Sequence, residues 1–432
     1  MKVAVIGTGY VGLTTAVALA LSDHLVVGID LNEEKIEALH QGKTPIYEPG
    51  LDEALIHVQS KKMITFTTDF DKAVQASEII FICVGTPSDI EGKADLGQLY
   101  QVIRQLRRAL QENKTRRVIV VKSTVPPGTC DQVAKQLADM SHLTVASNPE
   151  FLREGKALLD SMSPSRIVLG TESEEAFTRL VELYEKIPAI RLKTTPIQAE
   201  LIKYASNAFL SMRISFMNEL ARLCDKIGAD ITAVAVGMGL DSRIGPEFLQ
   251  AGLGYGGSCF PKDTLALLAV ARENNQPMDI LYQVTQVNET QPLWFLHKIE
   301  QQLNGCKDKT IAILGLAFKP ETDDIREAPS IKIIQQLLDR GAKVKAYDTI
   351  AMTNMKVIFS EDQITYESDA YEAVKQADAL ILCTEWDEFK QLDFERVYRY
   401  MKNPLVCDGR NALPRERLHA IGFKYLAIGL TS

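Results

Sequence analysis

The sequence predicts an α/β protein built from two doubly wound parallel sheets, which a long helix and a small helical region connect. Three observations carry this prediction. A strand, a glycine turn and an apolar helix follow one another in residues 2–21, and further strands and helices alternate after them. Residues 198–227 form one uninterrupted helical pattern. Residues 310–348 then repeat the strand–turn–helix–strand layout of the first unit.

Composition limits the possible functions. The 432 residues suffice for two to three domains, and 46% hydrophobic with 24% charged residues is ordinary for a globular protein. The net charge of −8 gives no general positive field, so we expect no nucleic acid partner. No apolar run approaches the roughly 18 residues of a membrane span, and the sequence begins directly with a predicted strand. We therefore expect a cytoplasmic protein that has no membrane partner.

The seven cysteines and six histidines indicate neither a metal site nor a disulfide framework. The cysteines are scattered and form no C-x-x-C pair, which fits a reducing compartment. The histidines all lie apart from the motifs described below. We therefore predict no metal and no histidine-based proton relay.

The first unit carries the fingerprint of a dinucleotide site. Residues 2–6 are typical of a buried parallel strand, Gly-Thr-Gly-Tyr-Val-Gly follows at residues 7–12, and a second strand ends at Asp30. The glycines allow a pyrophosphate to approach a helix N-terminus, while Asp30 would bind the ribose hydroxyls and repel a 2′-phosphate. We therefore predict NAD rather than NADP, bound by Gly7, Gly9, Tyr10, Val11, Gly12, Asp30 and Lys35. The pattern fits a solvated helix lysine at position 35 equally well.

Two later strand ends add candidate cofactor contacts. Residues 78–84 and 117–121 are predicted strands, and they lead to Thr86 and Thr124. Ligands of doubly wound sheets lie beyond the carboxyl ends of the strands. We therefore expect both threonines to lie near the cofactor.

A short predicted strand at residues 145–147 leads into Asn148-Pro-Glu-Phe-Leu-Arg-Glu-Gly. Glu150 and Glu154 would share one face if this segment were helical, and they would then fit surface charges. An Asn-Pro turn at a strand end instead directs them toward the site. A carboxylate there would serve as a general base or orient a water molecule.

The middle of the chain is a long helix. Apolar residues recur at spacings of three and four through residues 198–227, and Gly228 is a natural stop. Thirty helical residues span about 45 Å, more than the width of one domain. We expect this helix to join two domains and to pack against a partner subunit. Lys203 and Asn207 share a face, and the pattern alone favours a solvated stripe there.

The chemistry of the chain centres on residues 252–263, Gly-Leu-Gly-Tyr-Gly-Gly-Ser-Cys-Phe-Pro-Lys-Asp. The four glycines permit positive φ and close approach to a ligand, so we expect a loop. A nearby ammonium, that of Lys262, would raise the thiolate fraction of Cys259, with Asp263 completing an ion pair. This stretch alone fits a nucleophile and a chance cysteine in a turn about equally. The dinucleotide fingerprint upstream favours the nucleophile.

The second strand–turn–helix unit is altered. Only Gly315 remains of the fingerprint, and the strand-end acid, Asp348, follows it after 33 residues instead of 23. Lys319 and Arg326 make the intervening loop basic, which suits a phosphate, and Arg410 at a later strand end is a further candidate anion contact. We predict a second Rossmann-like domain whose loop serves another ligand. A structural repeat without a ligand is the alternative.

Together these motifs resemble the UDP-glucose 6-dehydrogenase family. They run in order between residues 7 and 327 as GTGYVG, VGTP, KSTVPPGT, NPEFLREG, KYASNAFL, FLQAGLGYGGSCFPKD and FKPETDDIRE, and CDGRN follows near the C-terminus. The family uses two NAD to oxidise the C6 alcohol of the sugar to a carboxylate through a cysteine-bound intermediate. Relatives that act on UDP-N-acetylaminosugars typically have His before the cysteine and Val-Asp-Pro after it. Because Ser258 precedes Cys259 here and Phe-Pro-Lys-Asp follows it, the expected substrate is UDP-glucose.

The resemblance also implies a domain organisation. It gives an NAD-binding Rossmann domain over residues 1–196, a central helical region with the cysteine loop over residues 197–297, and a Rossmann-like UDP-binding domain over residues 298–432. It further implies a homodimer formed through the central helix.

The resemblance implies roles for individual residues. It makes Cys259 the nucleophile, has Lys203 and Asp263 orient water and steady the oxyanion, and makes Glu150 an acid–base group and Asn207 a ligand of the substrate or oxyanion. The expected NAD contacts are Thr124, which also belongs to the catalytic group, Glu154, Lys262 and Arg326. The expected substrate contacts are Glu150, Phe151, Leu152, Lys203, Asn207, Phe248, Leu249, Gln250, Ala251, Gly252, Gly256, Lys319 and Arg410, with Arg243 reaching the substrate of a neighbouring subunit.

Two other functions stay open at this point. One is a dehydrogenase of a different UDP-sugar, such as a UDP-N-acetylhexosamine. The other is a non-catalytic protein that binds NAD, which the presence of Cys259, Lys203 and Asp263 disfavours.

Overall fold

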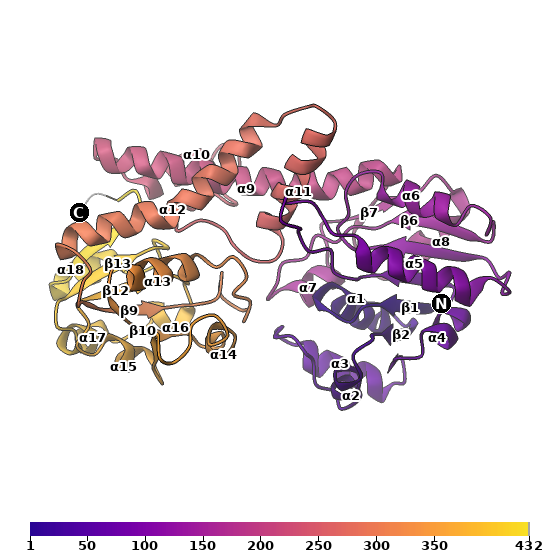
Figure 1. Cartoon of the computed structure of the whole chain (residues 1–432), viewed down its shortest axis with the longest axis horizontal. Helices are drawn as coiled ribbons and strands as arrows, with labels where there is room; N and C mark the ends of the chain where they lie inside the picture. Colours follow the sequence, from indigo (N-terminus) through magenta and orange to yellow (C-terminus); the bar gives the residue numbers. More distant parts are fainter. Residues whose placement is uncertain (431–432) are drawn as a thin grey trace. The chain divides into compact units, whose positions relative to one another are not determined.

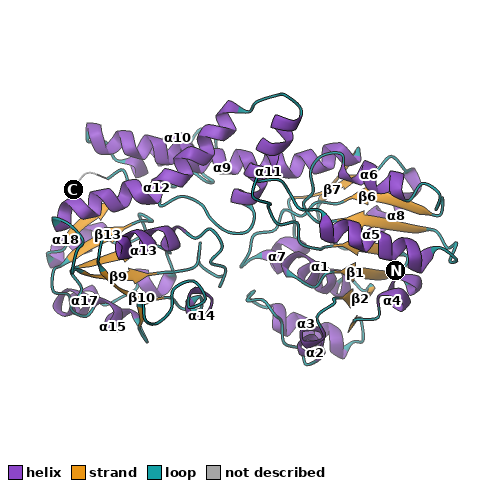
Figure 2. Ribbon diagram, in the orientation of Figure 1, coloured by secondary structure: helices purple, strands orange, loops and turns teal. Residues whose placement is uncertain are grey.

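The computed structural model describes residues 1–430, and the chain divides into two compact units (Figure 1). The first unit comprises residues 1–206 and 265–276, and the second comprises residues 207–264 and the chain from residue 277 onward. Each unit contains one sheet with helices on both faces (Figure 2). This confirms the predicted α/β class.

The sheet of the first unit has eight strands in the order β3-β2-β1-β4-β5-β6-β7-β8. Its first six strands follow the doubly wound order 3-2-1-4-5-6. All neighbouring pairs are parallel except β6 and β7. The strands are β1 (Lys2–Ile6), β2 (Leu25–Ile29), β3 (Ile64–Thr67), β4 (Ile79–Ile82), β5 (Arg117–Val121), β6 (Leu143–Ser147), β7 (Arg166–Gly170) and β8 (Ile190–Thr194).

Both faces of this sheet are covered because the strands are apolar on both faces. Along β1, Val3 and Val5 join one hydrophobic cluster while Ala4 and Ile6 join the other, as the two-residue period of a strand requires. Helix α1 packs into the first cluster and α5 into the second. The helices of this unit are α1 (Tyr10–Leu21), α2 (Glu33–His40), α3 (Leu51–Ser60), α4 (Phe70–Ala76), α5 (Gly97–Leu110), α6 (Thr129–Gln136), α7 (Ala157–Met162) and α8 (Glu174–Leu183).

The sheet of the second unit repeats the same order with six parallel strands, β11-β10-β9-β12-β13-β14. These are β9 (Thr310–Leu314), β10 (Lys343–Tyr347), β11 (Thr365–Tyr366), β12 (Ala379–Leu382), β13 (Leu405–Asp408) and β14 (Lys424–Ala427). The helices around it are α13 (Pro329–Asp339), α14 (Met352–Met355), α15 (Ala370–Val374), α16 (Asp387–Lys390), α17 (Phe394–Tyr400) and α18 (Arg415–Ile421).

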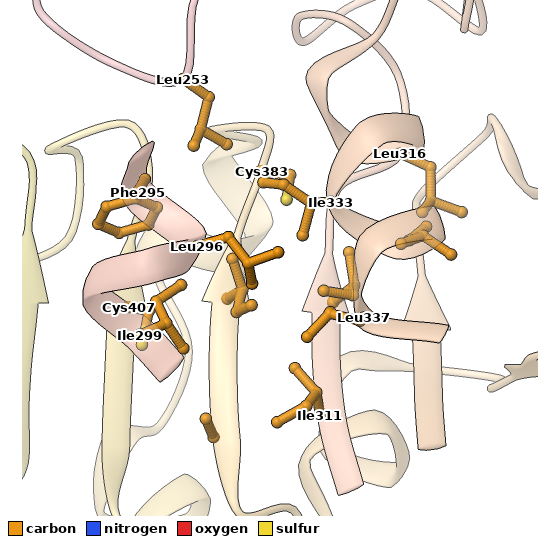
Figure 3. Close-up of a cluster of buried hydrophobic side chains, with 14 of the residues drawn as sticks. Leu253, Phe295, Leu296, Ile299, Ile311, Leu316, Ile333, Leu337, Cys383 and Cys407 are labelled. Carbon is orange, nitrogen blue, oxygen red and sulfur yellow. The ribbon is translucent and has the colours of Figure 1, made fainter. Parts of the chain in front are cut away.

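The core of the second unit also holds the cysteine loop in place. Figure 3 shows Phe295 and Leu296 on a helix that lies over strands of the sheet, with Leu253 of the loop beside them. Leu253 is fully buried, and its N–H donates to the carbonyl of Gly409 at 3.0 Å. The loop therefore has an apolar anchor six residues before Cys259.

The turn after the first strand of each sheet has the same backbone geometry, as the predicted repeat requires. Gly7 and Gly315 both have a φ of +90°, in the left-handed region that favours glycine. The N–H of Gly7 donates to the last carbonyl of β2 at 2.8 Å, and that of Gly315 to the last carbonyl of β10 at 2.9 Å. The two units therefore share the turn after their first strand.

The acids that follow these turns differ in their surroundings. Asp30 keeps 15% of its side chain exposed, whereas Asp348 is fully buried. The Oδ2 atom of Asp348 accepts hydrogen bonds from the N–H groups of Leu316 and Ala317, at 2.6 and 3.2 Å, and from the indole N–H of Trp386 at 3.2 Å. In the second unit the buried carboxylate of Asp348 therefore stabilises the turn after β9 by accepting hydrogen bonds from its backbone.

Four helices lie between the two sheets in the sequence: α9 (Pro196–Ile227), α10 (Ile231–Gly239), α11 (Phe260–Glu273) and α12 (Asp279–Leu303). The 32-residue α9 confirms the predicted long helix and ends before Gly228, whose φ is +78°. The division between the two units falls within α9, after Ser206, and within α11, after Thr264. The three domain boundaries given by the resemblance stay predictions. No helix in residues 1–430 has the length and apolar character needed to span a membrane.

Candidate active site

The glycine turn of the first unit leaves room for a dinucleotide. A Cβ atom on Gly12 would lie 1.8 Å from the carbonyl oxygen of Gly7, and one on Gly7 would lie 2.8 Å from the carbonyl oxygen of Cys83. These two glycines are therefore required for packing within the protein. A Cβ on Gly9 would meet nothing within 4 Å, so open space lies beside the N-terminus of α1. This arrangement fits the pyrophosphate of NAD.

Asp30 is preorganised as a hydrogen-bond acceptor. Its Oδ2 atom accepts from the N–H and hydroxyl of Thr8, at 3.0 and 2.8 Å, and from the ammonium of Lys35 at 2.9 Å. Burial raises the pKa of Asp30, but these hydrogen bonds outweigh burial and lower the pKa to about 2. The carboxylate is therefore ionised at neutral pH, as ribose recognition requires. Lys35 pairs with this acid and is not merely a solvated lysine.

A buried acid that the sequence analysis did not identify joins the glycine turn to the segment after β6. The Oε2 atom of Glu48 accepts hydrogen bonds from the Tyr10 hydroxyl and from the N–H of Gly155, the latter at 2.8 Å. Its Oε1 atom accepts from the N–H of Leu158 at 3.3 Å. Glu48 therefore fixes the backbone next to Glu154, a predicted NAD contact. The available signal was a single acid in the Tyr-Glu-Pro-Gly turn at residues 47–50.

The two strand-end threonines lie together. Thr86 follows β4, Thr124 follows β5, and the Thr86 hydroxyl donates to the Thr124 carbonyl at 2.7 Å. Thr86 is buried and Thr124 half-buried. This hydrogen bond joins the loop after β4 to the loop after β5, and it therefore helps to position Thr124.

Glu150 and Lys203 form a buried ion pair. The ammonium of Lys203 donates to Oε1 of Glu150 at 2.7 Å, and both side chains are at most 5% exposed. The alternative of a solvated Lys–Asn stripe is therefore wrong, since the helix buries this face. The segment at residues 148–155 is not helical, because α7 begins only at Ala157, so a shared helical face for Glu150 and Glu154 is also wrong.

The charge state of Glu150 follows from its neighbours. Burial raises its pKa, but the Lys203 ammonium, the N–H of Leu152 and the charge of Lys122 together lower it. The carboxylate is therefore ionised. An ionised carboxylate is suited to accept a proton or to hold a water molecule, and less suited to act as an acid.

A polar network that the sequence analysis missed lies behind this pair. The buried Lys122, one residue after β5, donates to Oδ1 of Asn148 at 3.0 Å, and the hydroxyl of Tyr184 donates to the same atom at 2.6 Å. The Nδ2 atom of Asn148 donates to the carbonyl of Val168 at 2.9 Å. Burial lowers the pKa of Lys122, while the nearby Glu150 opposes this effect. The network fixes the start of the Asn-Pro-Glu segment.

Cys259 stands at the N-terminus of α11 in the second unit. The N–H of Asp263 donates to the Cys259 carbonyl at 2.8 Å, so Cys259 is the residue that caps the helix. The positive end of the helix dipole favours a thiolate at this position. The expected loop therefore ends earlier than predicted, because Lys262 and Asp263 belong to the first turn of α11. The Ser258 hydroxyl lies 3.4 Å from the sulfur atom.

The first turn of α11 contacts α9 within the second unit. The amide of Asn207 donates to Oδ2 of Asp263 at 2.6 Å, and the ammonium of Lys262 pairs with Oδ1 at 2.5 Å. Asp263 and Asn207 are only 1% and 6% exposed. The ion pair between Lys262 and Asp263 that was expected from the sequence is thus confirmed. The ammonium of Lys262 binds the Asp263 carboxylate in this structure.

The glycines of the cysteine loop act in two ways. Gly254 and Gly257 have positive φ, of 100° and 83°. Gly252 and Gly256 do not have positive φ. A Cβ on Gly256 would lie 2.3 Å from the carbonyl oxygen of Glu327, so this glycine allows two backbones to touch.

A cavity of about 270 Å³ adjoins the loop in the second unit. Its lining unites five of the predicted substrate residues, Phe248, Gln250, Ala251, Gly252 and Arg410, with Ile214, Glu247, Gly254 and Glu385. Leu249 is buried beside it, while Gly256 and Lys319 are not part of the lining. The guanidinium of Arg410 donates to the carbonyls of Cys383, Gly254 and Phe318, at 2.6, 3.1 and 3.1 Å. Arg410 therefore also ties three loops together.

Two predicted contacts lie on exposed loops. Arg326 pairs with Asp324 through both guanidinium edges, at 2.7–3.0 Å, and is 63% exposed. Arg243 pairs with Asp241 and is 87% exposed. Their roles toward NAD and toward a neighbouring subunit stay predictions.

Each unit thus holds part of the predicted site. The first unit holds the glycine turn, Asp30, the two threonines and the Glu150–Lys203 pair. The second holds Cys259, Asp263, Asn207 and the cavity. Among the described residues, no group of three or more His, Cys, Asp and Glu could hold a metal ion.

Comparison with known proteins covers the whole chain. Models of the UDP-glucose/GDP-mannose dehydrogenase family match in three parts, the NAD binding domain at residues 1–188, the central domain at residues 197–290 and the UDP binding domain at residues 312–415. The chain is 43% identical over 433 aligned residues to a UDP-glucose 6-dehydrogenase of Bacillus subtilis, covering 99% of this chain and 98% of that protein. It is 44% identical over 439 aligned residues to one of Rhizobium meliloti, covering 99% of each.

Solved structures give the same result. The structure of a UDP-glucose dehydrogenase from the archaeon Pyrobaculum islandicum is similar with a TM-score of 0.93 and 40% identity, over 100% of this chain and 98% of that chain. A UDP-D-ManNAc dehydrogenase from Pyrococcus horikoshii is similar with a TM-score of 0.87 and 27% identity, over 99% of each chain.

Proposed function

The chain belongs to the UDP-glucose/GDP-mannose dehydrogenase family, and we propose that it oxidises the C6 alcohol of UDP-glucose to the carboxylate of UDP-glucuronate. Two NAD accept the four electrons that leave C6. The observation that carries the proposal is the position of Cys259 at the N-terminus of α11, one turn before the buried Asp263.

The position of the thiol accounts for oxidation beyond the aldehyde. The alcohol first loses a proton and a hydride to give the C6 aldehyde. The Cys259 thiolate adds to this carbon and forms a carbon–sulfur bond, and the second hydride leaves from the resulting hemithioacetal. Water then cleaves the carbon–sulfur bond of the thioester, which releases the carboxylate and returns the thiol.

The other predicted site residues have separate tasks in this proposal. The ionised Glu150, held by Lys203, accepts a proton from the attacking water or holds that water in place. The amide of Asn207 has two N–H groups, one of which is held by Asp263, and the other serves the oxyanion. The cavity beside Arg410 holds the nucleotide part of the substrate.

The test is NADH release from a panel of UDP-sugars. We expect two NADH for each UDP-glucose, with a far lower kcat/KM for UDP-N-acetylhexosamines. A preference for an N-acetylhexosamine would instead assign another UDP-sugar. Binding of NAD without NADH release from any nucleotide sugar would support the non-catalytic alternative.

We also propose that the chain forms a homodimer through α9. Phe209, Phe216 and Leu223 recur every seven residues on this helix, and their exposed fractions are 56%, 49% and 52%. Such a stripe is typical of a helix that packs against a partner. We place the protein in the cytoplasm because none of the seven cysteines, all of which lie in the described residues, forms a disulfide, as expected in a reducing compartment.

A further inference from the structure

The first unit contains a cavity of about 440 Å³. Its lining includes none of the predicted NAD contacts, but it includes three of the predicted substrate contacts, Glu150, Phe151 and Leu152. It lies between α1, the segment after β6, the loop before β7 and the end of α8. The lining also includes Lys122 but not Lys203. Its volume falls within the range of about 300–1,000 Å³ that is usual for small-molecule sites.

The cavity has two cations that lack an acidic partner. Lys122 is buried, and its hydrogen-bond acceptor is the neutral amide of Asn148 at 3.0 Å. The guanidinium of Arg166 donates to the hydroxyls of Ser165 and Ser206, at 3.1 and 3.3 Å. Neither cation has a carboxylate within 4.0 Å in residues 1–430.

The acids on the lining are already paired. Glu150 is bound to Lys203 at 2.7 Å, and Asp160 is bound by both edges of the Arg153 guanidinium, at 2.7 and 2.9 Å. The positive charges of Lys122 and Arg166 are therefore not compensated locally. An anion in the cavity would compensate them.

The neutral part of the lining also suits a polar ligand. The Oγ1 atom of Thr15 is buried and has no hydrogen-bond partner, although its residue lines the cavity. Ser161 and Ser163 add hydroxyls, while Ala18 and Ile187 form an apolar wall. A ligand with an oxyanion and a small apolar part would match this combination.

We propose that this cavity is a regulatory site for a small molecule that carries a phosphate group, with Lys122 and Arg166 binding the phosphate. The site acts on Glu150, because residues 148–151 line the cavity while the Glu150 carboxylate reaches Lys203. A phosphate at Lys122 weakens the positive field that keeps Glu150 ionised. Occupancy therefore lowers kcat, and it does not compete with NAD, because none of the predicted NAD contacts lines the cavity. This effect on kcat rests on the proposed function, whereas the binding does not.

The binding test uses inorganic phosphate as the probe and the full chain saturated with UDP-glucose and NADH, so that the substrate and cofactor sites are both filled and no oxidation takes place. Calorimetry at constant ionic strength, with chloride as the reference salt, should detect one phosphate per chain. We expect Arg166→Gln to weaken this binding at least tenfold. Ala18→Met, which places a side chain in the cavity, should abolish it. Arg108→Gln, which removes a 73% exposed arginine elsewhere on this unit, is the matched control and should leave it unchanged.

Three results would overturn the proposal. Phosphate binding that UDP-glucose and NADH abolish would belong to the substrate or cofactor site. Equal binding by wild type and a folded Ala18→Met variant would place the anion elsewhere, and a thermal melt checks the folding of each variant. Absence of binding by the wild type would also refute it. If phosphate binds as expected while UDP-glucose yields no NADH, the cavity stands and the proposed function fails.

Discussion

The amide of Asn207 on α9 holds the buried carboxylate of Asp263 on α11 at 2.6 Å. This contact fixes the first turn of the helix that Cys259 caps. Asp263→Asn keeps the size but removes the charge that binds Lys262. We expect kcat to fall by at least a hundredfold while the affinity for NAD changes less than threefold. Pre-steady-state NADH release and NAD titration on the same variant check this, and a normal kcat would remove Asp263 from the catalytic group.

Cys259→Ser tests the covalent step. A serine hydroxyl offers almost no oxyanion near pH 7, and an ester would hydrolyse more slowly than a thioester, so we expect sustained acid production to fall by several orders of magnitude. NAD affinity should survive because Gly7, Gly9, Gly12 and Asp30 are unchanged. The measurement is steady-state NADH release with UDP-glucose. Two NADH per substrate at a near wild-type rate would exclude the thioester.

Asp30→Asn tests cofactor choice and acid stability together. The folded pKa of about 2 lies below the unfolded value of 3.8, so Asp30 contributes roughly 2 kcal/mol of stability above pH 4. This contribution is lost as pH falls from about 4 to 2. The variant should therefore be less stable than the wild type at pH 7, and the difference should shrink near pH 2. Denaturant melts at both pH values check the stability.

The same variant should also narrow the preference for NAD over NADP, because a neutral amide no longer repels a 2′-phosphate. Side-by-side KM values for the two cofactors measure this. Comparable wild-type rates with saturating NADP would contradict the role of Asp30 in cofactor choice.

Leu253→Ala should destabilise the second unit by about 2–4 kcal/mol, because it removes a fully buried side chain from a packed core. It should also lower kcat, since Leu253 anchors the loop that carries Cys259. Leu159→Ala, at a 63% exposed position, is the control and should change stability by less than about 0.5 kcal/mol. Equal melting curves for the two variants would show that Leu253 is not a core anchor.

Phe216→Glu tests the homodimer. A charge in the exposed stripe on α9 should convert a dimer into monomers at micromolar concentration, as measured by sedimentation velocity. Ile90→Glu adds the same charge at a fully exposed position on the first unit and should leave the assembly unchanged. A wild-type protein that sediments as a monomer would refute the proposed dimer.

The sequence predicted the central strands because buried parallel strands are continuous apolar runs, as in β1 and β5. It did not predict β8, whose residues Ile190–Thr194 alternate with charges and are largely exposed. The helical pattern alone favours solvent for Lys203, because the burial of this side chain depends on Glu150, which lies 53 residues earlier. Contacts between residues that are distant in sequence leave no local periodic pattern. Glu48 was not predicted for the same reason, because its partners Tyr10 and Gly155 are distant in sequence.

The two acids that follow the second strand of each sheet, Asp30 and Asp348, show how the same fold can be adapted to different ligands. In the first unit the carboxylate of Asp30 remains accessible at the end of its strand, whereas in the second the indole N–H of Trp386 donates to the fully buried Asp348. An engineer who wished to install a dinucleotide in the second unit would therefore begin at Trp386. The glycine at the turn, Gly315, is already in place and needs no change.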